Sequence, residues 1–396
     1  MTPEGGRPHV LFAAISVGNG HRMAAEAGAR WLEAEAPGRF ERTVVDFTSE
    51  VGDHALDRRH KRSWRWMLRW PWTAYWGQRL VDDLVPSSWS RAVQSRMMHG
   101  HARSAARWLA DRDDALIVCT HFFTAHALSV ARRRHGLATP VVVVNPDAMD
   151  AHALWAAPDL DGYVVYGDAA ARDLARHGVP EARIHVVPPL LRPEFLGPAE
   201  DADRGAARRE LELPTDGFVA LWSAGGEGIG GPLPEVVRRW PRAGRGEADR
   251  PVTIVALCGR NERSRRRLER LASEAPPGLR LLPLGFRDDV RRLLAASDVV
   301  VGKAGPASTL EALISGRPVL FTGFAAANEK AVVDAVLAAG AGTLERRPAA
   351  IASLLDRWAA DPEATAALRN GVARMEVRNG GPEFARLLLD RFLAVA

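Results

Sequence analysis

Short apolar runs rich in valine and isoleucine recur along the whole chain, with segments long enough to form helices between them. In the first half these runs are HVLFAAIS, RTVVDF, ALIVCT, TPVVVVN, GYVVYG and RIHVVP, and in the second half they are GFVALWS, PVTIVALC, DVVVG and PVLF. Continuous apolar strands that alternate with helices are typical of parallel sheets covered on both faces. The sequence therefore predicts an α/β fold throughout.

The chain is also long enough for two domains. Its 396 residues exceed one ordinary hydrophobic core, so two domains of about 150 to 200 residues each are expected. The alternation of strands and helices stops at PPLLRPEFLGPAEDADRGA (188–206), whose prolines and acidic residues predict a hinge. We expect two Rossmann-like domains facing each other across a cleft, in residues 1–196 and 197–380, and a C-terminal helix in residues 381–396 that packs back toward the first domain.

The composition limits the classes of partner that the chain can bind and the cellular compartment that it can occupy. Lysine and arginine (53) outnumber aspartate and glutamate (48), and the net charge of +5 favours an anionic partner such as phosphate, anionic lipid or nucleic acid. Cys119 and Cys258 lie in separate apolar runs, so we expect two buried, reduced thiols and no cysteine metal cluster. No apolar stretch reaches the roughly 18 residues of a membrane span and no signal peptide is recognisable, which favours a cytoplasmic protein.

The first predicted strand leads into SVGNGHRMAAEA, where Gly18 and Gly20 predict a tight turn and His21 stands at the start of a helix. Glycines let the backbone approach a ligand, and a helix N-terminus offers free N–H groups to an anion. A dinucleotide fingerprint would place a third glycine where Met23 stands and an acidic residue before Asp46, so a nicotinamide oxidoreductase is disfavoured.

His21 has two interpretations at this point. The positive end of a helix dipole disfavours protonation, which would keep a neutral imidazole available as a base. A histidine that only caps the turn would have the same sequence context.

Three loops in the second half have the composition of anion-binding loops. The segment GGEGIGG contains Gly225 and Gly226 between a strand and a helix, although a flexible loop is an equal interpretation. Arg260 in CGRN follows a predicted strand, where a cation would suit a diphosphate, but a surface arginine would look the same. The strongest signal is VVVGKAGPASTLEALI, where backbone N–H groups and hydroxyls could hold phosphates and a glutamate one turn later could bind vicinal hydroxyls. Its candidate residues are Lys303, Gly305, Ala307, Ser308, Thr309 and Glu311.

These segments together resemble the monogalactosyldiacylglycerol synthase and processive diacylglycerol glycosyltransferase family, which is related to the N-acetylglucosaminyltransferase that forms lipid II. The resemblance rests on GNGHRMAAEA, VVDF, CTHFF, DAHALW, RPEF, GGEGIGG, CGRN, LGFRDDVRRLLAASDVVVGKAGPASTLEALISGRPV and GFAAANE, in this order over nearly the whole chain. It implies a GT-B fold in which the N-terminal domain takes the acceptor and the C-terminal domain holds a UDP-sugar.

The resemblance also implies roles for individual residues. His21 matches the residue taken as the catalytic base, and Glu311 matches the ribose ligand. Gly285 and Phe286 match the uracil seat, the GPAST backbone matches the diphosphate cradle, and Asn328 with Glu329 match the Gln-Glu pair that contacts the donor sugar.

The chain departs from the family pattern at positions that bear on specificity. Asn328 replaces the family's glutamine, Ala327 replaces the preceding glycine, and Val332 stands where the family has an asparagine. These changes shorten one sugar-reading contact and remove another, so the sequence does not predict which sugar is transferred. The family's TD after the fourth strand is NPDAMD here, and its small-residue hinge is PPLLRPEF, which leaves acceptor recognition open.

One further segment, KRSWRWMLRWPWTAYW (61–76), holds five of the chain's 12 tryptophans and no acidic residue. On a helix, the arginines from Arg58 to Arg69 would form one stripe opposite the tryptophans, and Pro71 would end that helix. Such a helix suits a bilayer interface, whereas a helix with its tryptophans in the core is the structural alternative. A single-stranded nucleic-acid platform has no other support in the chain. The predicted acceptor and membrane residues are Gly18, Gly20, Trp64, Arg65, Trp66, Arg69, Trp70, Trp72 and Trp76.

We therefore predict an inverting, metal-independent transferase that moves a hexose from a UDP-sugar to a hydroxyl of a membrane lipid such as diacylglycerol. It would need no cofactor, bind no nucleic acid and associate peripherally with the inner face of the cell membrane. The sequence does not indicate the oligomeric state. Three alternatives stay open: a polyprenyl-linked or specialised glycolipid acceptor, a nucleotide-sugar epimerase, and a lipid-associated binding protein without activity.

Overall fold

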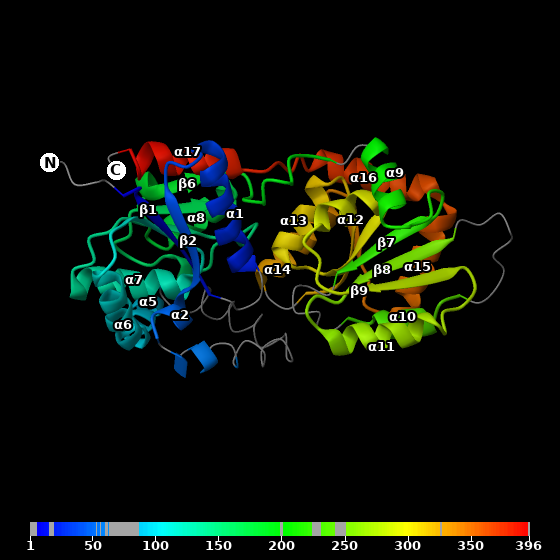
Figure 1. Cartoon of the computed structure of the whole chain (residues 1–396), viewed down its shortest axis with the longest axis horizontal. Helices are drawn as coiled ribbons and strands as arrows, with labels where there is room; N and C mark the ends of the chain where they lie inside the picture. Colours follow the sequence, from blue (N-terminus) through cyan, green and yellow to red (C-terminus); the bar gives the residue numbers. More distant parts are fainter. Residues whose placement is uncertain are drawn as a thin grey trace. The chain divides into compact units, whose positions relative to one another are not determined.

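The chain forms two compact units in a computed structural model (Figure 1). The first unit contains residues Met1–Pro193, Ala325–Asn328 and Asn379–Ala396, and the second contains Glu194–Phe324 and Glu329–Arg378. The passage from one to the other falls within the proline-rich stretch where the hinge was predicted. The structure describes residues 6–15, 20–52, 54–55, 57–59, 62, 87–198, 201–223, 231–241, 251–324 and 327–394.

The first unit is built on a parallel sheet of six strands in its described part, in the order β2-β1-β3-β4-β5-β6. The run VVVV, for example, becomes β4 with every residue buried, as expected for a strand covered on both faces. The strands are β1 (His9–Ala14), β2 (Glu41–Asp46), β3 (Asp114–Cys119), β4 (Val141–Val144), β5 (Gly162–Val165) and β6 (Ile184–Val186).

Helices cover both faces of this sheet, because successive strand residues point to opposite sides. Val10 and Phe12 belong to a core cluster shared with residues of α1 and α17, whereas Leu11 and Ala13 belong to a cluster that includes residues of α6, α7 and α8. The helices of this unit are α1 (Gly20–Glu35), α2 (Phe47–Glu50), α5 (Ser87–Met97), α6 (His99–Ala110), α7 (Phe122–His135), α8 (Asp168–Arg176) and α17 (Gly381–Arg391), with 3-10 turns η1 (Ala153–Trp155) and η2 (Glu181–Arg183).

The C-terminal helix α17 packs against α1 in the first unit, although nearly two hundred residues of the second unit precede it. The approach is close enough to require glycine, because a Cβ at Gly381 would overlap the indole of Trp31. That indole is held in place, since its Nε1 donates a hydrogen bond to the carbonyl oxygen of Leu191 at 2.7 Å. The hinge segment, α1 and α17 therefore form one packed layer.

The second unit has the same plan, with the strand order β12-β11-β10-β7-β8-β9 among its described residues. Its strands are β7 (Phe218–Ser223), β8 (Val252–Leu257), β9 (Leu279–Leu284), β10 (Val299–Lys303), β11 (Val319–Gly323) and β12 (Gly342–Leu344). Its helices are α9 (Asp201–Glu210), α10 (Leu233–Arg238), α11 (Glu262–Ala272), α12 (Val290–Ala296), α13 (Pro306–Ile314), α14 (Ala327–Ala338), α15 (Pro348–Ala360) and α16 (Pro362–Arg374).

This architecture confirms the predicted α/β class with two Rossmann-like sheets. Each apolar run quoted from the sequence forms a strand, whereas β9 and β12, the two edge strands of the second sheet, were not predicted. The sequence of β9, LRLLPL, contains Pro283, which is tolerated because an edge strand pairs on one side only. Cys119 and Cys258 are buried and free, as expected. Among the described residues, no helix has both the length and the apolar character that crossing a membrane requires.

The α1–α17 contact makes a prediction about stability. Replacing Gly381 with alanine should lower the free energy of unfolding by about 1–3 kcal/mol, because the new methyl group overpacks against Trp31. Chemical denaturation followed by tryptophan fluorescence would measure the change. The matched control is Gly100→Ala in α6, where an added Cβ meets nothing within 4 Å and should stabilise the helix by about 0.5–1 kcal/mol. Equal stability of Gly381→Ala and the parent chain would contradict this account of the contact.

Candidate active site

The site of the first unit lies where the strand order reverses. After β1 the chain forms β2 on one side of β1 and then β3 on the other side. Ligands of open α/β sheets bind outside the carboxyl ends of the strands at such a point. His21 lies just beyond β1 on the first turn of α1, Thr120 directly follows β3, and Asn145 directly follows β4. These residues therefore gather at one edge of the sheet.

Two reciprocal hydrogen bonds join His21 to Thr120. The His21 ring is bonded through Nδ1 to the carbonyl oxygen of Thr120 at 2.5 Å, and Thr120 Oγ1 donates to the carbonyl oxygen of His21 at 2.8 Å. A carbonyl oxygen can only accept, so Nδ1 carries a proton. In the neutral ring, Nε2 then keeps its lone pair and can take a proton from a ligand. The geometry thus supplies both the tautomer and the orientation of a general base.

Burial holds the pKa of His21 below its ordinary value of 6.5. The loss of hydration is the largest cause, and His152 adds to it, whereas the carboxylate of Asp147 and the bond to Thr120 oppose the shift. A lowered pKa keeps the imidazole neutral at pH 7, which is the state a base requires.

Asp147 is the carboxylate at the centre of this edge, and its side chain is buried. Its Oδ2 accepts a hydrogen bond from Trp155 Nε1 at 2.9 Å and lies 4.0 Å from His152 Nε2. Its Oδ1 accepts from Nδ2 of Asn328 at 2.6 Å, within the part of α14 that groups with the first unit. The carboxylate is therefore fixed by donors on both oxygens, and its charge acts on His21.

Aromatic rings complete this edge. The ring centroid of His21 lies 4.5 Å from that of His121 and 6.1 Å from that of Trp155. His121 caps α7, since its Nδ1 accepts from the backbone N–H of Phe123 at 3.1 Å. Trp155 is buried and packs edge-to-face with Phe122 at 5.6 Å. These contacts restrict the rotation of the imidazole.

The second unit has its own reversal point between β7 and β10. The chain runs from β7 to β8 and β9 on one side and then returns to form β10 on the other side of β7. Gly302 allows the close pairing here, because a Cβ would lie 2.6 Å from the carbonyl oxygen of Ser223. The GPAST loop follows β10 directly, so the predicted phosphate-binding segment lies at the carboxyl edge of this sheet.

The GPAST residues form the N-terminus of α13. Gly305 is the N-cap and Pro306 the first helical residue, so the N–H groups of Ala307 and Ser308 are the donors that helix geometry leaves for a ligand. Ser308 Oγ donates to the Gly305 carbonyl oxygen at 3.1 Å, and the Thr309 amide donates to the same oxygen at 3.0 Å. The side chains of Thr309 and Glu311 are both buried.

Lys303 and Glu329 lie together at this edge. Lys303 ends β10 and is exposed, whereas Glu329 lies in the first turn of α14 and is only 8% exposed. Lys303 Nζ lies 3.5 Å from Glu329 Oε1, so the two side chains form an ion pair. Because the Lys303 side chain is also exposed, it can contact an anionic ligand. Both residues were predicted from the sequence, whereas their pairing was not.

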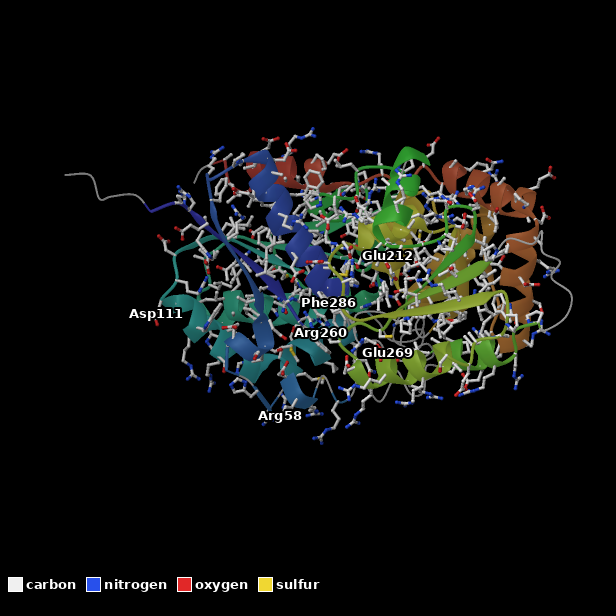
Figure 2. All side chains as sticks on the ribbon, turned by 45° about the vertical axis from the view of Figure 1, so that its right-hand side comes forward. Arg58, Asp111, Glu212, Arg260, Glu269 and Phe286 are labelled. Atoms are coloured by element: carbon white, nitrogen blue, oxygen red, sulfur yellow. The ribbon has the colours of Figure 1, made fainter. Side chains whose placement is uncertain are left out.

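Arg260 and Phe286 form a second pair in this unit. The guanidinium of Arg260 lies over the ring of Phe286, 4.3 Å from its centroid, and Figure 2 shows the two labelled side chains together. Gly285 precedes Phe286 at the end of β9, and 53% of the Phe286 side chain is exposed. An exposed aromatic ring beside a cation suits a planar base with phosphates attached.

The remaining predicted residues divide into two groups. Gly20 begins α1, where an added Cβ would meet nothing within 4 Å. The others lie outside the described residues: Gly18, Trp64, Arg65, Trp66, Arg69, Trp70, Trp72, Trp76, Gly225 and Gly226. Their roles stay predictions.

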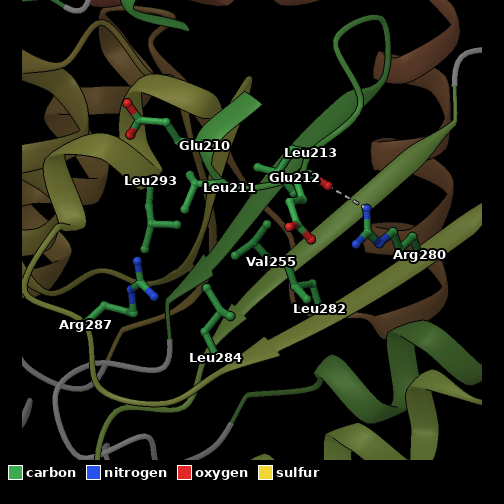
Figure 3. Close-up of a pocket in the computed structure, with 10 residues that line it drawn as sticks. All are labelled: Glu210, Leu211, Glu212, Leu213, Val255, Arg280, Leu282, Leu284, Arg287 and Leu293. Carbon is green, nitrogen blue, oxygen red and sulfur yellow. Dashed lines mark hydrogen bonds between the residues drawn. The ribbon is translucent and has the colours of Figure 1, made fainter. Parts of the chain in front are cut away.

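A separate cavity of about 240 Å³ lies in the second unit, between α9, β9 and α12 (Figure 3). Leucines such as Leu211, Leu282 and Leu293 line it, and Glu212 and Arg280 lie at its rim, where Arg280 Nη1 donates to the Glu212 carbonyl oxygen at 3.0 Å. None of the predicted site residues lines it. Among the described residues, no group of three or more histidines, cysteines or carboxylates has the arrangement of a metal site.

Residues 21–188 match the family model described as monogalactosyldiacylglycerol (MGDG) synthase. A probable monogalactosyldiacylglycerol synthase 2, chloroplastic, from Oryza sativa subsp. japonica is 28% identical over 360 residues, which cover 88% of this chain and 73% of the relative. Over most of its length the chain is therefore similar to the monogalactosyldiacylglycerol synthases. The resemblance stated from the sequence motifs is confirmed.

Solved structures show which fold the chain has. MurG from Acinetobacter baumannii superposes with a TM-score of 0.59 at 15% identity, over 97% of this chain and 99% of that chain. Anabaena HepE in complex with UDP-glucose superposes with a TM-score of 0.55 at 15% identity, over 98% and 100% of the two chains. The two Rossmann-like sheets are therefore those of the GT-B glycosyltransferase fold, as predicted.

Several residues of the site in the first unit were quoted from the sequence without a role. Thr120 and His121 belong to CTHFF, and His152 and Trp155 belong to DAHALW. Asp147 lies in NPDAMD, which was noted only as a departure from the family. The signal that could have identified them is their position after β3 and β4, because the carboxyl ends of neighbouring parallel strands share one edge.

The His21–Asp147 arrangement predicts a measurable pKa change. Asp147→Asn removes a negative charge that favours the imidazolium, so the pKa of His21 should fall further below 6.5. Histidine ring resonances followed by NMR across a pH titration would report it. Asp168→Asn, at an exposed carboxylate on α8, is the matched control and should leave the titration unchanged. A pKa of His21 that rises or stays constant in Asp147→Asn would contradict the electrostatic role of Asp147.

Proposed function

We propose that the chain is an inverting glycosyltransferase that moves a hexose from a UDP-sugar to a hydroxyl of a membrane lipid such as diacylglycerol. The observation that carries the proposal is His21, with its Nδ1 bonded to a carbonyl oxygen and Nε2 available as a base at the carboxyl edge of the sheet. Its similarity to monogalactosyldiacylglycerol synthases supports the lipid acceptor, and the UDP-glucose complex of Anabaena HepE supports the donor.

In this mechanism His21 activates the acceptor. Nε2 takes the proton of the lipid hydroxyl as that oxygen attacks the anomeric carbon from the face opposite UDP. The new glycosidic C–O bond forms while the bond between the anomeric carbon and the phosphate oxygen breaks. An α-linked donor thereby gives a β-glycoside, and the electron pair leaves with UDP.

The leaving diphosphate would be stabilised by the second unit. The N–H groups of Ala307 and Ser308 at the start of α13 are preorganised donors for an anion, and Lys303 brings a positive charge to the same edge. Phe286 and Arg260 would hold the uracil end, and Glu311 the ribose. These groups form the basis for proposing transfer without a metal ion.

The donor sugar would be read by Glu329 and Asn328. Lys303 orients the Glu329 carboxylate, which can accept hydrogen bonds from sugar hydroxyls. Peripheral attachment to the inner face of the cell membrane is part of the proposal, because the acceptor is a lipid and the segment 61–76 has the composition of an interfacial helix.

The direct test offers UDP-glucose, UDP-galactose and UDP-N-acetylglucosamine separately to the purified protein with liposomes that contain diacylglycerol and anionic lipid. UDP release coupled to a new glycolipid, detected by mass spectrometry, is the expected result and would identify the donor. Product on a polyprenyl-linked acceptor alone, or sugar epimerisation in the absence of lipid, would instead select one of the alternatives. No product with any donor, while UDP and liposomes still bind, would refute transfer to diacylglycerol.

Removing the base should abolish most of the activity. His21→Ala is expected to lower kcat by about 10²–10⁴-fold, the usual contribution of a general base. The measurement is UDP release with the active donor and saturating lipid. His185→Ala on β6 is the matched histidine control and should retain the parent rate. Near-normal turnover of His21→Ala would exclude it as the base.

Lys303 should affect the chemical step more than donor binding. Lys303→Met keeps the length of the side chain but removes the charge that faces the leaving group, so kcat should fall by about 10²–10³-fold. Steady-state kinetics would separate kcat from the KM of the donor. Lys330→Met is the matched control, because Lys330 pairs with Asp334 on α14 at 2.5 Å and should be dispensable. An increase in KM with unchanged kcat would restrict Lys303 to ground-state binding.

A further inference from the structure

Three side chains of the first unit form a hydrogen-bonded chain across β1, β2 and β3. Thr43 Oγ1 lies 2.9 Å from Nε2 of His9, and Nδ1 of the same ring lies 2.5 Å from Oδ1 of Asp114. His9 and Asp114 are the first residues of β1 and β3, and Thr43 is the third residue of β2. These three residues are called the Thr43 triad below.

The carboxylate of Asp114 determines which nitrogen of His9 carries the proton. An ionised carboxylate only accepts hydrogen bonds, so the 2.5 Å contact requires a proton on Nδ1 of the ring. Nε2 of the neutral ring then keeps its lone pair, and the hydroxyl of Thr43 donates to it. Nη2 of Arg112 lies 3.5 Å from Nδ1, which is too long to displace the carboxylate. The triad is thus ordered as nucleophile, base and orienting group.

Arg112 and Trp108 hold the carboxylate of Asp114 in its orientation. Nε of Arg112 donates to Asp114 Oδ2 at 2.8 Å, and Nη2 donates to Oδ1 at 3.1 Å. The guanidinium lies over the ring of Trp108, 4.5 Å from its centroid. Only 3% of the Asp114 side chain is exposed, so water competes little for the carboxylate. The orientation of the His9 ring is therefore set by a buried carboxylate that is bonded through both oxygens.

The hydroxyl at the other end of the triad is accessible. Among the described residues β2 is an edge strand that pairs with β1 alone, and Thr43 is exposed on it. The N–H of Glu41 donates to the carbonyl oxygen of Pro8, so the alternation of the strand directs the N–H of Val44 to the free side. The residue after the nucleophile is where hydrolases of known mechanism place one oxyanion donor. The free edge of β2 therefore supplies a hydroxyl and an N–H beside it.

We propose that Thr43 is a nucleophile toward activated carboxylic esters and thioesters, with His9 as its general base and Asp114 as the residue that positions the base. A nucleophile, a base and an orienting group within hydrogen-bond reach are the arrangement that such chemistry requires. Because β2 supplies one oxyanion donor, the geometry favours substrates with a good leaving group. The proposal does not rest on sugar transfer, since Asp114 lies about 20 Å along β3 from Thr120, at the opposite edge of the sheet.

The reaction has two steps that share the same base. Nε2 of His9 takes the proton of Thr43 as Oγ1 bonds to the carbonyl carbon, and the bond from that carbon to the leaving oxygen or sulfur breaks. The leaving group takes the electron pair and then the proton from His9. Water next attacks the acyl carbon while His9 takes a proton from it, the bond to Oγ1 breaks, and the proton returns to Thr43. The net reaction is hydrolysis to a carboxylic acid and an alcohol or thiol.

The test is hydrolysis of p-nitrophenyl acetate by the full chain, followed as release of p-nitrophenolate. Thr43→Val keeps the shape of the side chain but removes the hydroxyl, so the rate should fall by at least about tenfold. Thr43→Ser keeps the nucleophile and should retain activity. The matched control is Thr215→Val, at an exposed threonine before β7, which should hydrolyse the ester like the parent chain. Mass spectrometry of the acid-quenched parent chain should find the acetyl group on Thr43.

Asp114 is tested through the tautomer of His9. Arg112 has only donors, so in Asp114→Asn the amide oxygen should turn to Arg112 and the amide nitrogen to Nδ1 of the ring. The ring proton should then move to Nε2, and hydrolysis should fall by at least about tenfold because Nε2 can no longer take a proton. NMR of the ring nitrogens would report the tautomer. The matched control is Asp113→Asn, at an exposed carboxylate, which should change neither the tautomer nor the rate.

The outcomes separate this proposal from the proposed function. Thermal unfolding would verify that all variants are folded. Equal hydrolysis by the parent chain and Thr43→Val, or an acetyl group found only on other residues, would overturn the proposal. An unchanged rate in Asp114→Asn would also overturn it, whatever the tautomer. UDP release by Thr43→Val should match that of the parent chain. If no chain releases UDP while Thr43 is acetylated, the triad stands and the proposed function fails.

Discussion

The hydrogen-bonded link between His21 and Thr120 is the interaction on which the site of the first unit depends. It joins the start of α1 to the end of β3, and the Thr120 amide also donates to the carbonyl oxygen of Ala13 at the end of β1. One backbone position therefore connects two strands and the helix at the point where strand order reverses. Because the bond uses Nδ1, it also determines which ring nitrogen faces a ligand. The fold and the chemistry of the base are thus set by the same contact.

Burial lowers the pKa of His21, whereas the negative charge of Asp147 raises it. The net pKa stays below 6.5, so the imidazole is neutral at pH 7. Burial alone would make protonation costly and leave the ring a weak base. Asp147 offsets part of that cost, and hydrogen bonds to both of its oxygens hold the carboxylate in place. The imidazole consequently stays neutral at rest, while a carboxylate is close enough to stabilise the imidazolium that forms when a proton is taken up.

The sequence predicted the fold class, both sheets and the position of His21, because these depend on local apolar runs and on glycine and helix-start signals. It missed β9 and β12, whose short or proline-containing sequences form strands only because a neighbouring strand pairs with them. It also missed the role of Asp147, which lies 126 residues after His21 in the numbering of the chain. Such a contact depends on strand order, and strand order is a property of the whole sheet that no local pattern encodes. The pairing of Lys303 with Glu329 was hidden for the same reason.

Asn328 stands where the family has a glutamine, and its side-chain amide is held by Asp147. The Asn328 amide nitrogen donates to Asp147 at 2.6 Å, so this donor is engaged by the carboxylate that also acts on His21. In the proposed function, the bond to Asp147 uses one of the two N–H groups of the Asn328 amide and fixes the plane of that amide, whose oxygen is an acceptor for a sugar hydroxyl. Glu329 is likewise an acceptor when ionised. A donor sugar read by this pair would meet an amide oriented by Asp147 and a carboxylate paired with Lys303, so the orientation of its hydroxyl groups would decide which UDP-sugar the enzyme accepts.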